Sequence, residues 1–127
     1  LFVALGITGD DVSEGAARYR VDPIEGDGGV VDTLAITTAA DQCLVTAAST
    51  LIEQGREETN GTAEMNLTYV AEPPGAVSVE GTVVHKGSHL TVSTVEAMDQ
   101  AGAIVATGRG SYAIRPLHPA GTSGAGA

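Results

Sequence analysis

The chain is poor in cysteine, in aromatic residues and in long apolar runs, and each shortage excludes a class of protein structure. Its 127 residues include one cysteine, Cys43, so no internal disulfide can form. Aromatic residues make up only 3% of the chain, so the core must be built from Val, Leu, Ile and Ala. No charge-free apolar run reaches the roughly 18 residues of a membrane-spanning helix. With no signal peptide visible, the lone cysteine predicts a cytoplasmic protein.

Basic residues are also scarce. Six Lys and Arg stand against sixteen Asp and Glu, which gives a formal charge of −10. A surface this acidic repels phosphate backbones, so nucleic acid is excluded as a partner, although one local basic pocket for a small anionic ligand is not. The length fits a single domain.

The order of elements is read from hydrophobic periodicity and from turn residues. Residues 16–22 (AARYRVD) alternate as a short strand. A helix is predicted from Gly28 or Gly29 to about residue 54, with Gly55 ending it, and its scattered apolar residues indicate burial on most sides. Four strand-like runs follow at 62–71, 76–85, 89–98 and 104–114. Gly108 and Gly110 in the last run predict a bulge or a close backbone approach.

This order predicts an α+β fold in which a curved antiparallel sheet of about five strands wraps one long central helix. Such a sheet leaves edge strands uncovered, so association of copies is expected. We predict one domain over residues 1–115 and a disordered tail over residues 116–127, whose sequence PLHPAGTSGAGA is of low complexity.

Several stretches, taken in order, resemble one family. They are DGGVVDTLA, TAEMNLTYV, the turn PPG, VVHKGSHL and DQAGAIVA. Together they are similar to the hotdog-fold acyl-CoA thioesterases of the PaaI-like (phenylacetate-pathway) group. The resemblance implies a hotdog fold, a homodimer or homotetramer, and hydrolysis of acyl-CoA thioesters at sites between subunits.

The resemblance also implies site residues, beginning with the glycine pair. Gly28 takes the position whose N–H polarises the thioester carbonyl, and Gly29 follows it. A plain turn before a helix is the alternative reading of this pair. Aligned on Gly28, the helix carboxylate of the family falls at Ile36, which cannot carry a proton. Asp27 replaces the histidine of the family and could simply cap the helix.

Asp32 is the natural substitute for the missing carboxylate. It lies four residues before Ile36, hence on the same helix face and about 5.4 Å nearer the N-terminus. The alternative is that Asp32 only interacts with the helix dipole. Thr62 stands where the family has a Ser or Thr that orients water or substrate. Asp41 lies off the Asp32 face and is read as a surface or interface charge.

The phosphates of CoA would need cations. The candidates are Lys86, His85, His89 and Arg109, with Gly87 letting the backbone approach; a solvated hairpin tip explains the same residues. Cys43 is read as a small core residue. Neither a metal-ligand spacing nor a phosphate loop appears, so no cofactor is predicted.

Two further functions stay open because Ile36 occupies the carboxylate position. One is a hotdog protein that binds acyl-CoA or fatty acyl groups without hydrolysing them. The other is a structural subunit that pairs with an active partner chain. The sequence favours the thioesterase and leaves its acyl group unspecified.

Overall fold

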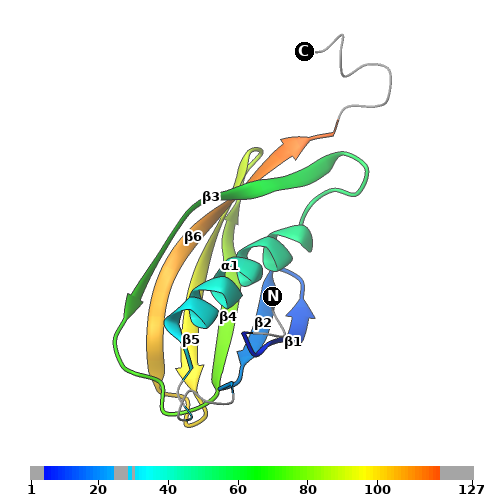
Figure 1. Cartoon of the computed structure of the whole chain (residues 1–127). Coiled ribbons are helices and arrows are strands. Elements are labelled where there is room, and N and C mark those ends of the chain that lie inside the picture. Colours follow the sequence, from blue (N-terminus) through cyan, green and yellow to red (C-terminus); the bar gives the residue numbers. More distant parts are fainter. Residues whose placement is uncertain (1–4, 25–28, 30, 118–127) are drawn as a thin grey trace.

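The computed structural model describes residues 5–24, 29 and 31–117. One helix lies against a single curved sheet (Figure 1). Among these residues, no helix is long and apolar enough to cross a bilayer. The elements in chain order are β1 (Ile7–Ser13), β2 (Ala16–Val21), α1 (Thr33–Ser49), β3 (Glu57–Tyr69), β4 (Val77–Lys86), β5 (Leu90–Asp99) and β6 (Ile104–Pro116).

The sheet has six strands in the order β1-β2-β4-β5-β6-β3, and every neighbouring pair is antiparallel. The predicted α+β class is confirmed. The strand not predicted is β1, an edge strand in which only Ile7 is buried. Its other side chains face solvent, so the sequence of β1 carries no alternation that would have revealed it.

Helix α1 is shorter than predicted. It begins at Thr33 rather than near Gly29, because Asp32 adopts an extended backbone and its side chain accepts a hydrogen bond from the Leu34 N–H. Such a residue is an N-cap, and Asp suits this position well. The helix ends at Ser49, and Gly55 lies beyond it in the turn that leads to β3.

One face of α1 is buried against the concave face of the sheet. The buried residues recur at helical spacing and are mostly small: Ala35, Ile36, Ala39, Ala40, Cys43, Leu44, Ala47 and Ala48. The predicted enclosure on most sides holds from Ala35 to Ala48, where every side chain is buried or half-buried, whereas Thr33 and Leu34 (59% exposed) face solvent. The half-buried face that points away from the sheet leaves room for a partner or a ligand.

Two glycines let α1 approach the sheet closely. A Cβ at Gly81 of β4 would lie 2.8 Å from the Cys43 Cβ, and one at Gly110 of β6 would lie 2.5 Å from Leu44 Cδ1. At Gly108 the crowding comes from β3, whose Asn66 carbonyl oxygen would lie 1.9 Å from an added Cβ. The close approach predicted at Gly108 and Gly110 is therefore confirmed.

Strand β3 starts earlier than predicted. The predicted run begins at residue 62, but residues 57–59 already pair with residues 114–116 of β6. The pairing register shifts between Thr59 and Thr62, so this irregularity hid the strand's periodicity. At the other end of the chain, the Leu117 N–H donates to the Arg56 carbonyl at 2.7 Å, while residues 118–127 of the predicted tail lie outside the described range.

Candidate functional site

The first turn of α1 lies close to the end of β3 (Figure 1). An open groove lies beside them. Its volume is about 480 Å³, and most of its lining is apolar. The lining residues are Val31, Thr33, Tyr69, Val70, Ala71, Glu72 and Pro73. Ligand sites commonly have volumes of about 300–1,000 Å³ with mostly apolar walls, so this groove has a suitable size and character.

Tyr69 ties the end of β3 to the first turn of α1. Its hydroxyl lies 2.6 Å from Thr37 Oγ1 and donates to the Thr33 carbonyl oxygen at 3.1 Å. Met65 and Leu67, which precede Tyr69 at alternate positions of β3, are partly buried and pack against the core. Tyr69 is 38% exposed, so its ring contributes a wall of the groove.

Asp32 lies between two residues that line this groove, Val31 and Thr33. Its carboxylate is exposed, and Oδ1 accepts the Leu34 N–H at 2.8 Å. It therefore interacts directly with the helix N-terminus, as the dipole alternative requires. An exposed carboxylate beside a groove can also act as a base, so the two roles are compatible.

Ile36 is fully buried in the hydrophobic core. Its side chain faces the sheet, so it does not line the groove in the single chain. The position that would carry the family's carboxylate thus serves packing here. In the first turn of the helix, Thr33 and Leu34 are exposed. In the next turn, Thr37 is half-buried.

Thr62 and Asp41 form a contact that the sequence reading missed. Thr62 Oγ1 donates to Asp41 Oδ1 at 2.5 Å, linking β3 to the middle of α1. Thr33, Thr37 and Asp41 recur every four residues, so they share the helix face that contacts β3. That spacing is the signal that could have paired Asp41 with the strand.

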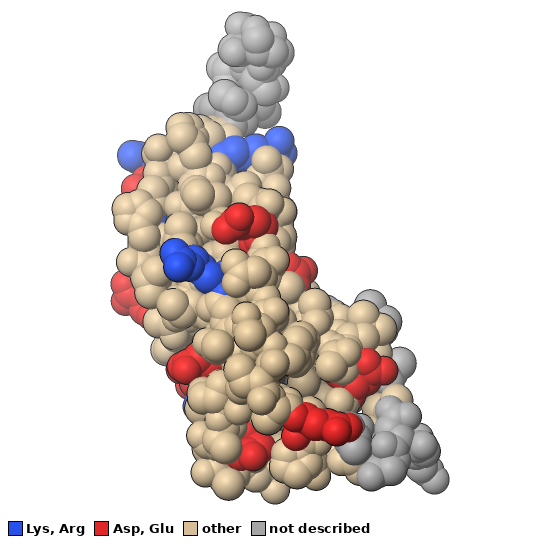
Figure 2. Space-filling model, turned by 90° about the vertical axis from the view of Figure 1, so that its left-hand side faces the viewer, with Lys and Arg blue, Asp and Glu red and all other residues tan. Residues whose placement is uncertain are grey.

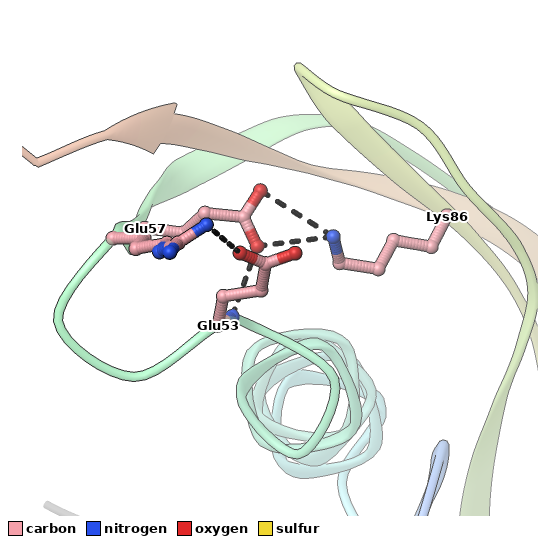
Figure 3. Close-up of polar contacts among 4 residues, drawn as sticks. Glu53, Glu57 and Lys86 are labelled. Carbon is pink, nitrogen blue, oxygen red and sulfur yellow. Dashed lines mark hydrogen bonds and ion pairs between the residues drawn. The ribbon is translucent and has the colours of Figure 1, made fainter.

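Lys86 is paired within the chain. Its Nζ lies 3.0 Å from Glu57 Oε1, and the two side chains are 27% and 15% exposed. Glu57 Oε1 also accepts the Glu53 N–H at 2.9 Å (Figure 3). The cluster joins the segment after α1 to the end of β4. The positive charge of Lys86 is thereby largely compensated, and its contact with CoA phosphates stays a prediction.

Replacing Glu57 with glutamine should lower stability at neutral pH. The pKa of the Glu57 carboxyl lies below its ordinary value because the Glu53 N–H donates to it and Lys86 pairs with it. A carboxyl with a lowered folded pKa stabilises the protein fully above its unfolded pKa, and this contribution is lost as the pH falls through the folded value. Urea midpoints measured from about pH 7 down to about pH 3 should fall less steeply for Glu57→Gln than for the parent.

Glu58→Gln is the matched control for that experiment. Glu58 is the next residue of β3 and pairs with Arg115 of β6, but both side chains are more exposed, at 37% and 59%. Exposed ion pairs contribute little, so this change should shift the midpoint less. Equal shifts for the two variants would contradict a special role for the Glu57 cluster.

The remaining predicted phosphate contacts are not gathered at the groove. His89 is exposed and Gly87 half-buried in the β4–β5 hairpin with Lys86, whereas Tyr69 and Thr33 mark the opposite end of α1. With 17 residues, α1 is about 25 Å long. Arg109 lines a separate hollow of about 500 Å³ on the outer face of the sheet. Figure 2 shows Lys and Arg chiefly in the upper half of the face in view and acids dominating below.

Cys43 is unsuited to nucleophilic chemistry. It is fully buried, its Sγ donates to the Val79 carbonyl at 3.3 Å, and burial raises the pKa of its thiol to about 12. The thiol therefore stays protonated at neutral pH. Within the part of the chain that the structure describes, no three His, Cys, Asp or Glu side chains gather to hold a metal ion.

The glycine pair is only partly described. Gly29 has a φ of +81°, in the left-handed region that favours glycine. Asp27 and Gly28 lie outside the described residues, so their predicted roles stay predictions.

Solved structures with the same architecture come from several bacteria. A thioesterase from Haemophilus influenzae aligns with a TM-score of 0.79 at 15% identity, over 92% of this chain and 83% of that one. A thioesterase family protein from Silicibacter pomeroyi aligns with a TM-score of 0.78 at 20% identity, over 91% and 89%. A Streptococcus mutans protein bound to acetyl CoA aligns with a TM-score of 0.72 at 15% identity, over 88% and 90%.

No protein-family model matches the chain, and no curated protein matches it significantly. At identities this low, the structural likeness establishes the fold and not the activity. The arrangement of one central helix packed against an antiparallel sheet matches these structures. The chain therefore has the hotdog fold of the thioesterase structures that it resembles.

Proposed function

We propose that the chain is an acyl-CoA thioesterase of the PaaI-like group. The observation that carries the proposal is the apolar groove beside the N-terminus of α1, with the Asp32 carboxylate between two of its lining residues. The acyl chain would lie against Val31, Tyr69 and Val70. The thioester carbonyl would then lie near the helix N-terminus, and the resemblance implies that Gly28 donates its N–H to it.

The reaction follows from these positions. The partial positive charge of the helix N-terminus stabilises the oxyanion that forms as water adds to the carbonyl carbon. Asp32 takes a proton from that water. The C–S bond then breaks, and CoA leaves as a thiolate. The thiolate takes the proton that Asp32 had accepted from the water. The products are a carboxylic acid and CoA.

The proposal includes a homodimer or homotetramer. Strand β3 is an edge strand of 13 residues that is mostly exposed, and one face of α1 is only half-buried. An open edge of this length is a ready template for pairing with another strand. A second copy is the proposed occupant, and light scattering on the active sample gives the number of copies.

The direct test is CoA release from short, medium and aromatic acyl-CoAs by the purified chain. We expect saturable release of free thiol from at least one of these substrates. Release no faster than in buffer, with every acyl-CoA, would rule out the thioesterase.

A second function is favoured by one observation, the burial of Ile36 where a carboxylate is expected. In this alternative the same groove binds an acyl thioester without cutting it. Calorimetry with CoA and acyl-CoA separates the two proposals: binding with no free thiol produced supports the alternative, while hydrolysis or an absence of binding counts against it.

A further inference from the structure

The hydroxyl of Tyr69 is held at two points by the first turns of α1. It contacts both Thr37 Oγ1 and the Thr33 carbonyl oxygen, and Thr37 Oγ1 in turn lies 2.8 Å from that same carbonyl. Each hydroxyl has one proton to donate, so either order of donation leaves both hydroxyls bonded. The ring of Tyr69 is therefore fixed across the space between β3 and α1.

The wall that continues from Tyr69 is also fixed. The N–H groups of Val70 and Ala71 both point to the Val105 carbonyl oxygen, at 2.8 Å and 3.3 Å. Pro73 is buried below them. The side chain of Val70 nevertheless stays 57% exposed and presents apolar surface to the groove. The groove thus has a preformed lining that a ligand does not need to rearrange.

We propose that Tyr69 sets the size of the acyl group that the groove accepts and restricts it to short acyl chains. This inference rests on the proposed function, because it names the substrate class of the same site. The phenol ring lines the groove and is held by its hydroxyl, so it can turn aside for a longer chain only by breaking the contacts to Thr33 and Thr37. The first two turns of α1 thereby limit the length of the acyl chain by holding Tyr69 in place.

The test compares kcat/KM for acetyl-, hexanoyl- and palmitoyl-CoA in the parent and in Tyr69→Ala and Tyr69→Phe. The parent should prefer the short acyl group. Removing the ring should raise the palmitoyl-to-acetyl ratio by about tenfold or more, the scale on which hydrophobic pockets discriminate chain length. Tyr69→Phe keeps the ring but releases it, so its ratio should shift in the same direction by a smaller factor.

Tyr19→Phe is the matched control. The Tyr19 hydroxyl is also bonded to a threonine of α1, at 2.8 Å from Thr46 Oγ1, but Tyr19 does not line the groove. Its ratio should equal that of the parent. If Tyr69→Ala does not fold, as judged by circular dichroism, Tyr69→Phe alone decides the matter.

The outcomes separate the two proposals. Turnover in the parent with an unchanged ratio in the Tyr69 variants overturns the role of Tyr69 and leaves the thioesterase standing. If the parent binds acyl-CoA without cutting it, the palmitoyl-to-acetyl ratio of association constants replaces the ratio of kcat/KM, and the same rise is expected. A parent that neither binds nor cuts any acyl-CoA overturns both.

Discussion

Replacing Asp32 with asparagine is expected to lower kcat for acyl-CoA hydrolysis by about 10²- to 10⁴-fold, the usual contribution of a general base. Asparagine is as good an N-cap as aspartate, so its side-chain oxygen can still accept the Leu34 N–H. The variant therefore removes the base and keeps the start of α1. Stopped assays of free thiol give kcat, and a thermal melt shows whether the helix cap has survived.

Asp41→Asn is the matched control, since Asp41 is the other carboxylate within α1 and accepts from Thr62. It should retain most of the parent kcat. A large loss in Asp41→Asn together with nearly full activity in Asp32→Asn would move the base to Asp41. Full activity in both variants would contradict catalysis by either carboxylate. Asparagine is used rather than alanine because Asp32→Ala would remove the base and the helix cap together.

Replacing Gly108 with alanine is expected to destabilise the fold by about 3 kcal/mol or more, the upper range of overpacking effects. The added Cβ would lie 1.9 Å from the carbonyl oxygen of Asn66, which belongs to the backbone of β3 and cannot rotate aside. Strands β3 and β6 must then separate locally or change register. A urea titration followed by circular dichroism measures the loss.

Gly75→Ala is the control for that change. It lies in the turn before β4, has no atom within 4 Å of an added Cβ, and is not among the glycines of positive φ. Its urea midpoint should stay close to that of the parent or rise slightly, because alanine restricts the unfolded chain. A Gly108→Ala midpoint as little changed as that of Gly75→Ala would contradict the crowding at the β3–β6 contact.

The sequence predicted those parts of the fold whose residues repeat regularly. The strands β2, β4, β5 and β6 and the centre of α1 follow from apolar spacing, and their observed limits differ from the predicted ones by a few residues. Strand β1 and the first part of β3 were not predicted, since β1 buries only Ile7 and β3 contains a register shift after Thr59. The helix start was misplaced because several residues before Thr33 could act as caps.

The candidate site was less accessible from the sequence. Asp32 was predicted to lie within the helix on the face of Ile36, but its extended backbone makes it the N-cap, and its capping hydrogen bond depends on that conformation. The contacts of Tyr69 with Thr37 and of Thr62 with Asp41 join residues far apart in the chain. Periodicity describes one element at a time, so it does not reveal which side chains of a helix meet which side chains of a strand.

The position of β3 in the sheet has a consequence for how the chain acquires its structure during synthesis. Strand β3 emerges before β4, β5 and β6, yet among the described strands it pairs only with β6, where residue 57 lies opposite residue 116. Such long-range pairing carries a loop-closure cost and forms slowly. The pairing of β3 with β6, which involves Thr62 and Tyr69, can therefore form only after β6 has been synthesised. Until then β3 is an unpaired strand to which chaperones or other chains can bind.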